Sequence, residues 1–290
     1  MLGDRHPETL SSINNMAGLL QEQGRLDEAK LLYEEDLRVS RQVLGDKHPS
    51  TLISINNMAT LLQEQGELDE AKLLFEESLR VKREVLGDRH PETLASINNL
   101  ASLLQEQGEL DQAKLLFEED LRVSREVLGS RHPETLTSVN NMGKLLQEQG
   151  ELDEAKLLSE EALRVSREVL GNHHKDTLSR MGFMANLLQE QGELDEARSL
   201  FEEALRGRRE VLGDRDDDTL TSINDLASLI EEQGKLAEAI PLFTEELEGY
   251  VALHGIDHEE TRDAAEHLAG VLGEAGEQKK AKALAKKHGL

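Results

Sequence analysis

The chain has 290 residues, a formal net charge of −26, no cysteine or tryptophan, and only 2% aromatic residues, which excludes an ordinary large core built around rings. The negative charge would repel phosphate backbones and anionic lipid, and no apolar run is long enough to span a bilayer, so nucleic acid and membrane are poor partners. The lack of cysteine and of a secretory signal over residues 1–4 favours a soluble chain in a reducing, cytoplasmic compartment.

The N-terminal Leu2 and Gly3 resemble the end of a repeat, such as Leu128 and Gly129 further along the chain. No polar cap precedes the first repeat, so we expect an uncapped apolar face there that is open to end-to-end self-association. The sequence leaves open whether the chain is cut from a longer array or is an engineered or recently duplicated scaffold.

Two series of regularly spaced glycines divide the chain into repeats. One series marks seven units with a period of 42 residues, which begin at residues 3, 45, 87, 129, 171, 213 and 255. The other has the same period and splits each unit into two segments of about 20 residues, at Gly24, Gly66, Gly108, Gly150, Gly192, Gly234 and Gly276. Residues 1–290 are therefore predicted to form a single stacked array of seven units, the last of which is a divergent C-terminal cap.

The third unit shows the local pattern. Its first segment, residues 90–108, carries one apolar stripe at helical spacing, starts at Pro91 and closes at Gly108. Its second segment, residues 109–129, carries another stripe, with Asp111 placed to cap the helix. Each unit is therefore predicted to be a helix-turn-helix, and the chain to be all-α.

The small residues Ala101 and Ala113, together with Phe117 and the intervening Gly108, resemble the tetratricopeptide-repeat (TPR) pattern. The 42-residue period and the His-Pro opening resemble the longer repeats of kinesin light chains and nephrocystin-like proteins. This resemblance implies a right-handed α-solenoid of TPR units in which first helices line a concave groove.

Three residues depart from the TPR pattern. Asp36, Ser78 and Asp120 stand late in the second segment, where the family usually keeps a small residue. We expect local packing to differ there.

A row of amides on the first helices is the candidate binding surface. An amide both donates and accepts, so such a row can pair with the backbone of an extended peptide whatever its side chains are. Stacked helices lie roughly 8–10 Å apart, so each unit would meet about every third ligand residue. The candidate residues are Asn14, Asn56, Asn98, Asn140 and Asn224, with Gln21, Gln63, Gln105 and Gln147 beyond them.

A second row of asparagines is adjacent to the first in sequence. Its members are Asn15, Asn57, Asn99 and Asn141. Each is rotated by about 100° from its neighbour on a helix, so we expect this row to face the neighbouring unit and to serve the scaffold.

The fifth unit interrupts both rows. Gly182 and Phe183 replace the asparagine pair, and Phe183 is expected either to fill the core between units or to line an apolar pocket for a ligand side chain. Lys144 and Arg180 are the few cations placed on first helices, where they could hold a single carboxylate.

The groove is otherwise predicted to be acidic. Glutamates recur near the ends of the first helices, at Glu22, Glu64, Glu106, Glu148, Glu190 and Glu232. A neutral or basic peptide is the expected partner, in contrast to the acidic cargo peptides that the resemblance to kinesin light chains implies.

No residue pattern indicates catalysis, a metal site or a cofactor. The histidines and aspartates of the repeat junctions, such as His90, His174 and Asp216, are placed to cap the first helices. The sequence therefore predicts a non-enzymatic adaptor that binds a peptide in its groove, and the alternative is a structural or assembly array without a specific groove ligand.

Overall fold

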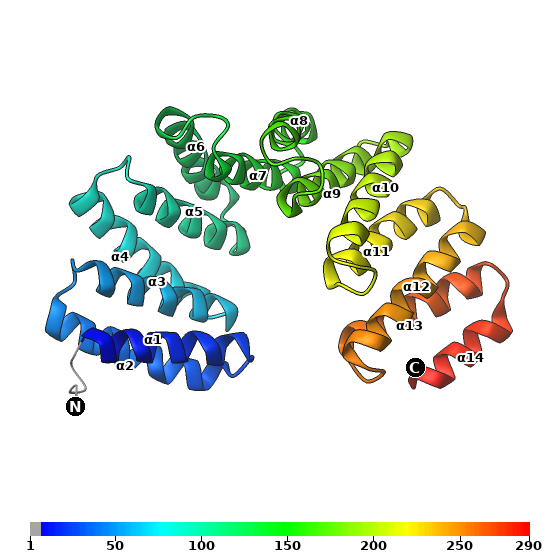
Figure 1. Cartoon of the computed structure of the whole chain (residues 1–290), viewed down its shortest axis with the longest axis horizontal. Coiled ribbons are helices and arrows are strands. Elements are labelled where there is room, and N and C mark those ends of the chain that lie inside the picture. Colours follow the sequence, from blue (N-terminus) through cyan, green and yellow to red (C-terminus); the bar gives the residue numbers. More distant parts are fainter. Residues whose placement is uncertain (1–6) are drawn as a thin grey trace. The chain divides into compact units, whose positions relative to one another are not determined.

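The computed structural model describes residues 7–290, apart from the side chain of Pro7, and over that range it contains fourteen helices and no strand. The first helices of the repeats are α1 (Pro7–Glu22), α3 (Pro49–Glu64), α5 (Pro91–Glu106), α7 (Pro133–Glu148), α9 (Lys175–Glu190), α11 (Asp217–Glu232) and α13 (Glu259–Glu274). The second helices are α2 (Leu26–Leu44), α4 (Leu68–Leu86), α6 (Leu110–Val127), α8 (Leu152–Val169), α10 (Leu194–Val211), α12 (Leu236–His254) and α14 (Gln278–His288). The predicted all-α solenoid class is confirmed (Figure 1). The features expected at Leu2 and Gly3 lie outside the described residues.

Loop residues cap several first helices, as predicted. The backbone N–H of Ser50 donates to His48 Nδ1 at 3.1 Å, and that of Glu92 donates to His90 Nδ1 at 3.2 Å. In the sixth repeat Asp216 takes this role, because its Oδ1 accepts from the N–H of Asp218 at 3.1 Å. Each of these bonds satisfies a backbone donor that the helix itself leaves unpaired.

The turn within each repeat requires glycine. Gly66 and Gly108 have φ values of +75° and +74°, in the left-handed region that side chains disfavour.

The second helix of the third repeat does not begin where the sequence predicts. α6 starts at Leu110 after Glu109, which makes no side-chain capping bond, and Asp111 lies in the first turn. Asp111 therefore complements the helix dipole but does not cap the helix.

The chain divides into two compact units, an N-terminal unit that ends at Leu145 and a C-terminal unit from Leu146 to Leu290. The boundary lies within α7. The organisation of all seven repeats as one domain stays a prediction.

In the N-terminal unit, helices α1 to α6 pack on one another in chain order (Figure 1). Small side chains allow the helices of a repeat to approach closely, since Ala59 and Ala71 are fully buried. Phe75 and Phe117 are each 1% exposed, and burying such a ring stabilises the fold by roughly 1.5–3 kcal/mol. The core is therefore a repeated small-and-large pattern, which explains how a chain with few aromatic residues can fold.

In the C-terminal unit, α8 to α14 also pack in chain order. One continuous apolar cluster runs from Leu163 to Ala281 and includes Met181 and Met184 of the fifth repeat. No helix among the described residues has both the length and the hydropathy needed to cross a bilayer.

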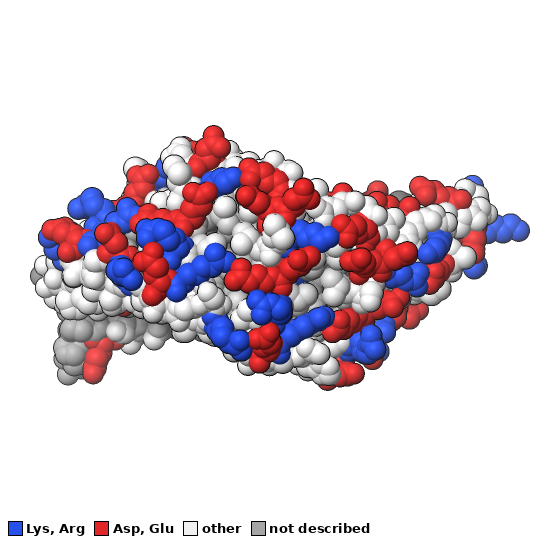
Figure 2. All heavy atoms as spheres, turned by 90° about the horizontal axis from the view of Figure 1, so that it is seen from above, with Lys and Arg blue, Asp and Glu red and all other residues white. Residues whose placement is uncertain are grey.

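Ion pairs join each of several second helices to the turn that precedes the second helix of the next repeat. Lysine–glutamate pairs form at 2.7–2.9 Å between Lys30 and Glu67, Lys72 and Glu109, and Lys156 and Glu193. Figure 2 shows basic and acidic side chains interspersed over one face of the molecule. Pairs that are this exposed contribute about 0–1 kcal/mol each, so they mainly help to fix the alignment of the repeats.

Candidate functional site

Asparagines of consecutive first helices form a hydrogen-bonded ladder in the N-terminal unit. The donor and acceptor atoms are Asn57 Nδ2 and Asn14 Oδ1 at 2.8 Å, Asn99 Nδ2 and Asn56 Oδ1 at 3.0 Å, and Asn141 Nδ2 and Asn98 Oδ1 at 2.7 Å. The second asparagine row faces the neighbouring repeat, as predicted. The first row supplies the acceptors, and within the described part of the chain its Nδ2 groups at Asn14, Asn56 and Asn98 donate to no protein atom.

The other two members of the first row have different surroundings. Asn140 is half-buried on α7. Asn224 donates from Nδ2 to Glu246 Oε1 of α12 at 3.0 Å. Glu246 is 4% exposed, and burial raises the pKa of its carboxyl to about 7, although the bond from Asn224 partly offsets this effect.

The glutamines that continue the candidate surface also bridge repeats. Gln21 Nε2 donates to Glu64 Oε1 at 2.7 Å, and Gln63 Nε2 donates to Glu106 Oε2 at 2.6 Å. Gln147 donates in the same way to Glu190, and Gln105 is half-buried on α5. These amides hold the recurring glutamates in place.

The three candidate residues that are not amides lie in different environments. Lys144 is exposed on α7, and Phe183 is half-buried on α9. Arg180 is 7% exposed, and its Nη1 donates to the carbonyl of Asp176 at 2.9 Å. Arg180 is therefore placed inside the repeat stack and not on its open face, and this burial lowers the pKa of its guanidinium.

Sequence reasoning did not identify two buried acids as site residues. Asp36 and Asp120 are 2% and 3% exposed, although carboxylates are seldom buried without a cationic partner. They occupy equivalent positions of α2 and α6, two repeats apart. The available signal was that each replaces a small residue of the TPR pattern.

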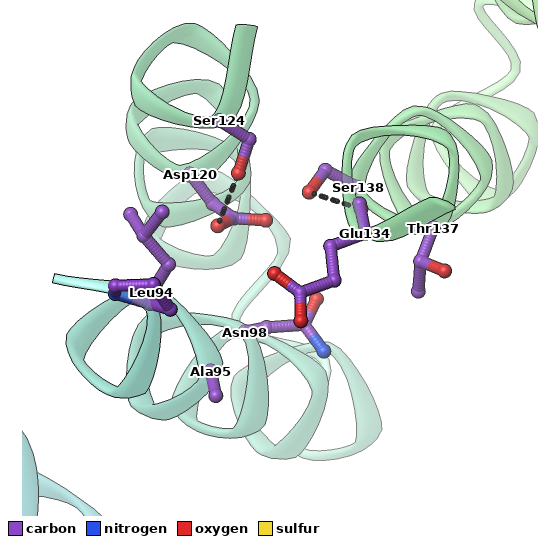
Figure 3. Close-up of a pocket in the computed structure, with 9 residues that line it drawn as sticks. Leu94, Ala95, Asn98, Asp120, Ser124, Glu134, Thr137 and Ser138 are labelled. Carbon is purple, nitrogen blue, oxygen red and sulfur yellow. Dashed lines mark hydrogen bonds between the residues drawn. The ribbon is translucent and has the colours of Figure 1, made fainter. Parts of the chain in front are cut away.

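A pocket of about 180 Å³ lies against Asp120, between α5, α6 and α7. Its other walls are Pro91, Leu94, Ala95 and Asn98 of α5, Ser124 of α6, and Glu134, Thr137 and Ser138 of α7. Figure 3 shows the carboxylates of Asp120 and Glu134 pointing into the same space from two helices. The pocket borders Asn98, so it adjoins the asparagine row.

A similar pocket of about 150 Å³ lies against Asp36, between α1, α2 and α3. Its walls include Asn14, Ser40 and Ser54, which are equivalent to Asn98, Ser124 and Ser138. The Oγ of Ser54 donates to Asp36 Oδ2 at 2.6 Å. Ser50 replaces Glu134, so this pocket has one carboxylate where the other has two.

Both pockets are electrostatically unbalanced. Burial raises the pKa of Asp36 and of Asp120, while hydrogen bonds from neighbouring serines lower it. Glu134 and Glu119 raise the pKa of Asp120 further. Neither pocket has a basic side chain in its walls.

One group of possible metal ligands lies between α12 and α13. The ligand atoms of His254, His258 and Glu260 lie within 4.8 Å of one another. His254 Nε2 is already 2.8 Å from Asp217 Oδ1 and 3.2 Å from Glu260 Oε2, so hydrogen bonding accounts for this arrangement. The expectation that no metal is bound stays a prediction.

A family model described as the tetratricopeptide repeat matches residues 8–84, 56–126, 92–168, 134–210, 176–250 and 218–288. The chain belongs to the tetratricopeptide-repeat family. Members of this family generally mediate protein–protein interactions, so this TPR chain is a protein-interaction scaffold in the general sense. No curated protein matches it.

Solved structures with the same fold include kinesin light chain-like TPR proteins. Two are structures of a Podosopora anserina kinesin light chain candidate with nearly identical TPR-like repeats, at 25% and 29% identity and TM-scores of 0.64 and 0.62. The matched regions cover 73% and 71% of this TPR chain, and 99% and 97% of the two solved chains. BtubC (BKLC) from P. vanneervenii, at 21% identity and a TM-score of 0.64, covers 85% of this chain and 92% of its own, and shows the fold alone.

Proposed function

We propose that this TPR chain is a non-catalytic, cytoplasmic adaptor that binds an extended peptide segment in the groove lined by its first helices. The observation that carries the proposal is the first asparagine row of the N-terminal unit. Its half-exposed residues Asn14, Asn56 and Asn98, in three consecutive repeats, have Nδ2 groups with no protein acceptor among the described residues. Such donors need water or a ligand, and a peptide carbonyl supplies the required acceptor.

The charge of the groove favours a neutral or basic peptide. The two pockets beside the row contain Asp36 and Asp120 and no basic side chain. The whole chain carries a net charge of −26. A basic partner would associate faster at low ionic strength, and the affinity would fall as salt is added.

A peptide-library screen on the full chain tests the proposal. The informative variant combines Asn14→Asp, Asn56→Asp and Asn98→Asp, because aspartate keeps the acceptor that holds the ladder but removes the outward N–H donors. Neutral peptides should lose roughly tenfold or more in affinity for this variant. The control, Asn57→Ala with Asn99→Ala, removes ladder donors and should keep the affinity. Neutral hits that bind all three proteins equally would reject the asparagine row as the contact surface.

A second candidate, a structural array that assembles through its second helices, rests on a separate observation. Leu31, Leu73 and Leu115 recur at one position of α2, α4 and α6 and are 66–67% exposed. If no peptide binds, and sedimentation shows self-association that Leu31→Lys, Leu73→Lys and Leu115→Lys together abolish, this candidate replaces the adaptor.

A further inference from the structure

The interfaces between consecutive repeats place polar residues at the same three repeat positions, but these residues differ in charge. Each interface brings together two positions near the end of a second helix and one position on the following first helix. In the N-terminal unit these three positions are Asp36, Ser40 and Ser54; then Ser78, Lys82 and Ser96; then Asp120, Ser124 and Ser138. The first and third interfaces thus contain an acid, and the middle one contains a base.

In the middle interface the chain places its own cation in this position. Lys82 is 8% exposed, and its Nζ donates to Ser96 Oγ at 2.9 Å. Ser96 is equivalent to Ser54 and Ser138, which line the two acidic pockets. The position that the Lys82 ammonium occupies therefore has a counterpart in each of those pockets.

The C-terminal unit repeats the arrangement with arginine. Arg208, equivalent to Lys82, is 8% exposed, donates to Ser222 and also donates to the carbonyl of Asp218 at 3.1 Å. The acid position of that interface is occupied by Ala204. Where Ser78 or Ala204 replaces the acid, a lysine or arginine of the chain fills the interface.

Where the acid is present in the N-terminal unit, the cation is missing and a pocket is present. Asp36 and Asp120 lie in pockets of about 150 and 180 Å³ whose walls contain hydroxyls, amides and no basic side chain. A buried carboxylate without a counter-charge is costly, and a cation that enters with hydrogen-bonding partners removes most of that cost.

We propose that these two pockets each receive a cationic side chain, lysine or arginine, of the peptide bound in the groove, an inference that rests on the proposed adaptor function. The Lys82 and Arg208 interfaces show the chemistry, because in each of them a cationic nitrogen donates to the serine at the equivalent position. The two pockets add an aspartate to that serine. The pocket at Asp120 is the stronger of the two because Glu134 adds a second carboxylate at its mouth.

The spacing of the pockets sets the spacing of the ligand. They lie two repeats apart, and an extended peptide advances about 3.3 Å per residue across first helices that lie about 10 Å apart, so its basic residues should be about six positions apart. The middle interface, which Lys82 already occupies, should disfavour a basic residue halfway between them.

The test measures binding of dye-labelled Ala/Ser peptides to the full chain by fluorescence anisotropy at low salt. One peptide carries two lysines about six positions apart, a second carries them about three apart, and a third replaces both with norleucine. The first should bind best. Asp120→Asn should weaken its binding by roughly tenfold or more and Asp36→Asn by a smaller factor, whereas Glu118→Gln, which removes a charge from an exposed site on α6, should not.

A variant that fills the pocket gives an independent test without removing the acid. Ser124→Lys places a lysine where Lys82 stands in the preceding interface and should block the pocket, so lysine peptides lose affinity as in Asp120→Asn. Equal affinities of the lysine and norleucine peptides, or equal binding by Asp120→Asn and the unchanged chain, would overturn the inference alone if neutral peptides still depend on the asparagine row. If no peptide of any kind binds, the adaptor function fails with it.

Discussion

The side-chain amide of Asn99 donates a 3.0 Å hydrogen bond to Oδ1 of Asn56, one repeat earlier, so a residue of the proposed ligand surface also joins two repeats. A double-mutant cycle of Asn56→Ala and Asn99→Ala should therefore give a coupling free energy of about 0.5–1.5 kcal/mol in urea unfolding. The pair Asn56→Ala and Asn57→Ala serves as the control, because these neighbours do not bond to each other. A coupling near zero for the first pair would contradict the ladder.

Filling the pocket at Asp120 should stabilise the fold. Lys82 shows that a lysine fits at the equivalent position, so Ser124→Lys should pair with Asp120 and raise the free energy of unfolding by on the order of 1 kcal/mol. Ser166→Lys makes the same substitution in an interface that has Ala162 in place of the acid and contains the buried Arg180. This control should lower the melting temperature, and a rise in both variants would show that the acid is irrelevant.

The carboxyl of Glu246 should make stability depend on pH. Burial raises its pKa from 4.5 to about 7 in the folded state, so the folded state holds this proton more tightly than the unfolded chain does. Its contribution is favourable at low pH, falls as the pH rises through this window, and is constant above it. Glu246→Gln should have the same free energy of unfolding as the unchanged chain below about pH 4.5. Above about pH 7 its free energy of unfolding should be higher by on the order of 2 kcal/mol. Thermal unfolding at several pH values measures this, and a constant difference across the range would contradict it.

The histidine cap of the third repeat can be exchanged for the cap that the chain uses elsewhere. His90→Ala leaves the N–H of Glu92 without its acceptor and should cost about 1 kcal/mol. His90→Asp should restore stability, because Asp216 already caps the first helix of the sixth repeat. Circular dichroism melts give the comparison, and equal melting temperatures for all three proteins would show that the cap contributes nothing.

The repeat architecture could be predicted from the sequence because its determinants are local. Gly108 at the turn, Pro91 at the helix start and the apolar stripes each act within one repeat. The start of α6 was misplaced because Asp111 is a good capping residue, yet α6 begins at Leu110, two residues earlier than a cap at Asp111 allows. Helix ends depend on backbone geometry that residue type alone does not determine.

The candidate site was only partly predictable because its contacts join different repeats. The asparagine row was identified from periodicity, but the bond from Asn141 to Asn98 depends on how adjacent first helices align. The surroundings of Asp120 likewise come from two helices, because Ser138 of α7 lies beside it. An acid in place of a small residue marked the position, and only the packing shows that a pocket lies beside it.

The most direct test of the central claim is to locate a bound peptide by following the side-chain amide NMR signals of the asparagines. The tightest peptide from the screen is titrated into the full chain. The signals of Asn14, Asn56 and Asn98 should shift together and saturate with the same affinity. The methyl signals of the exposed Leu31, Leu73 and Leu115 are followed in the same titration. Shifts confined to these methyl signals, with the asparagine signals unmoved, would contradict the groove as the binding surface.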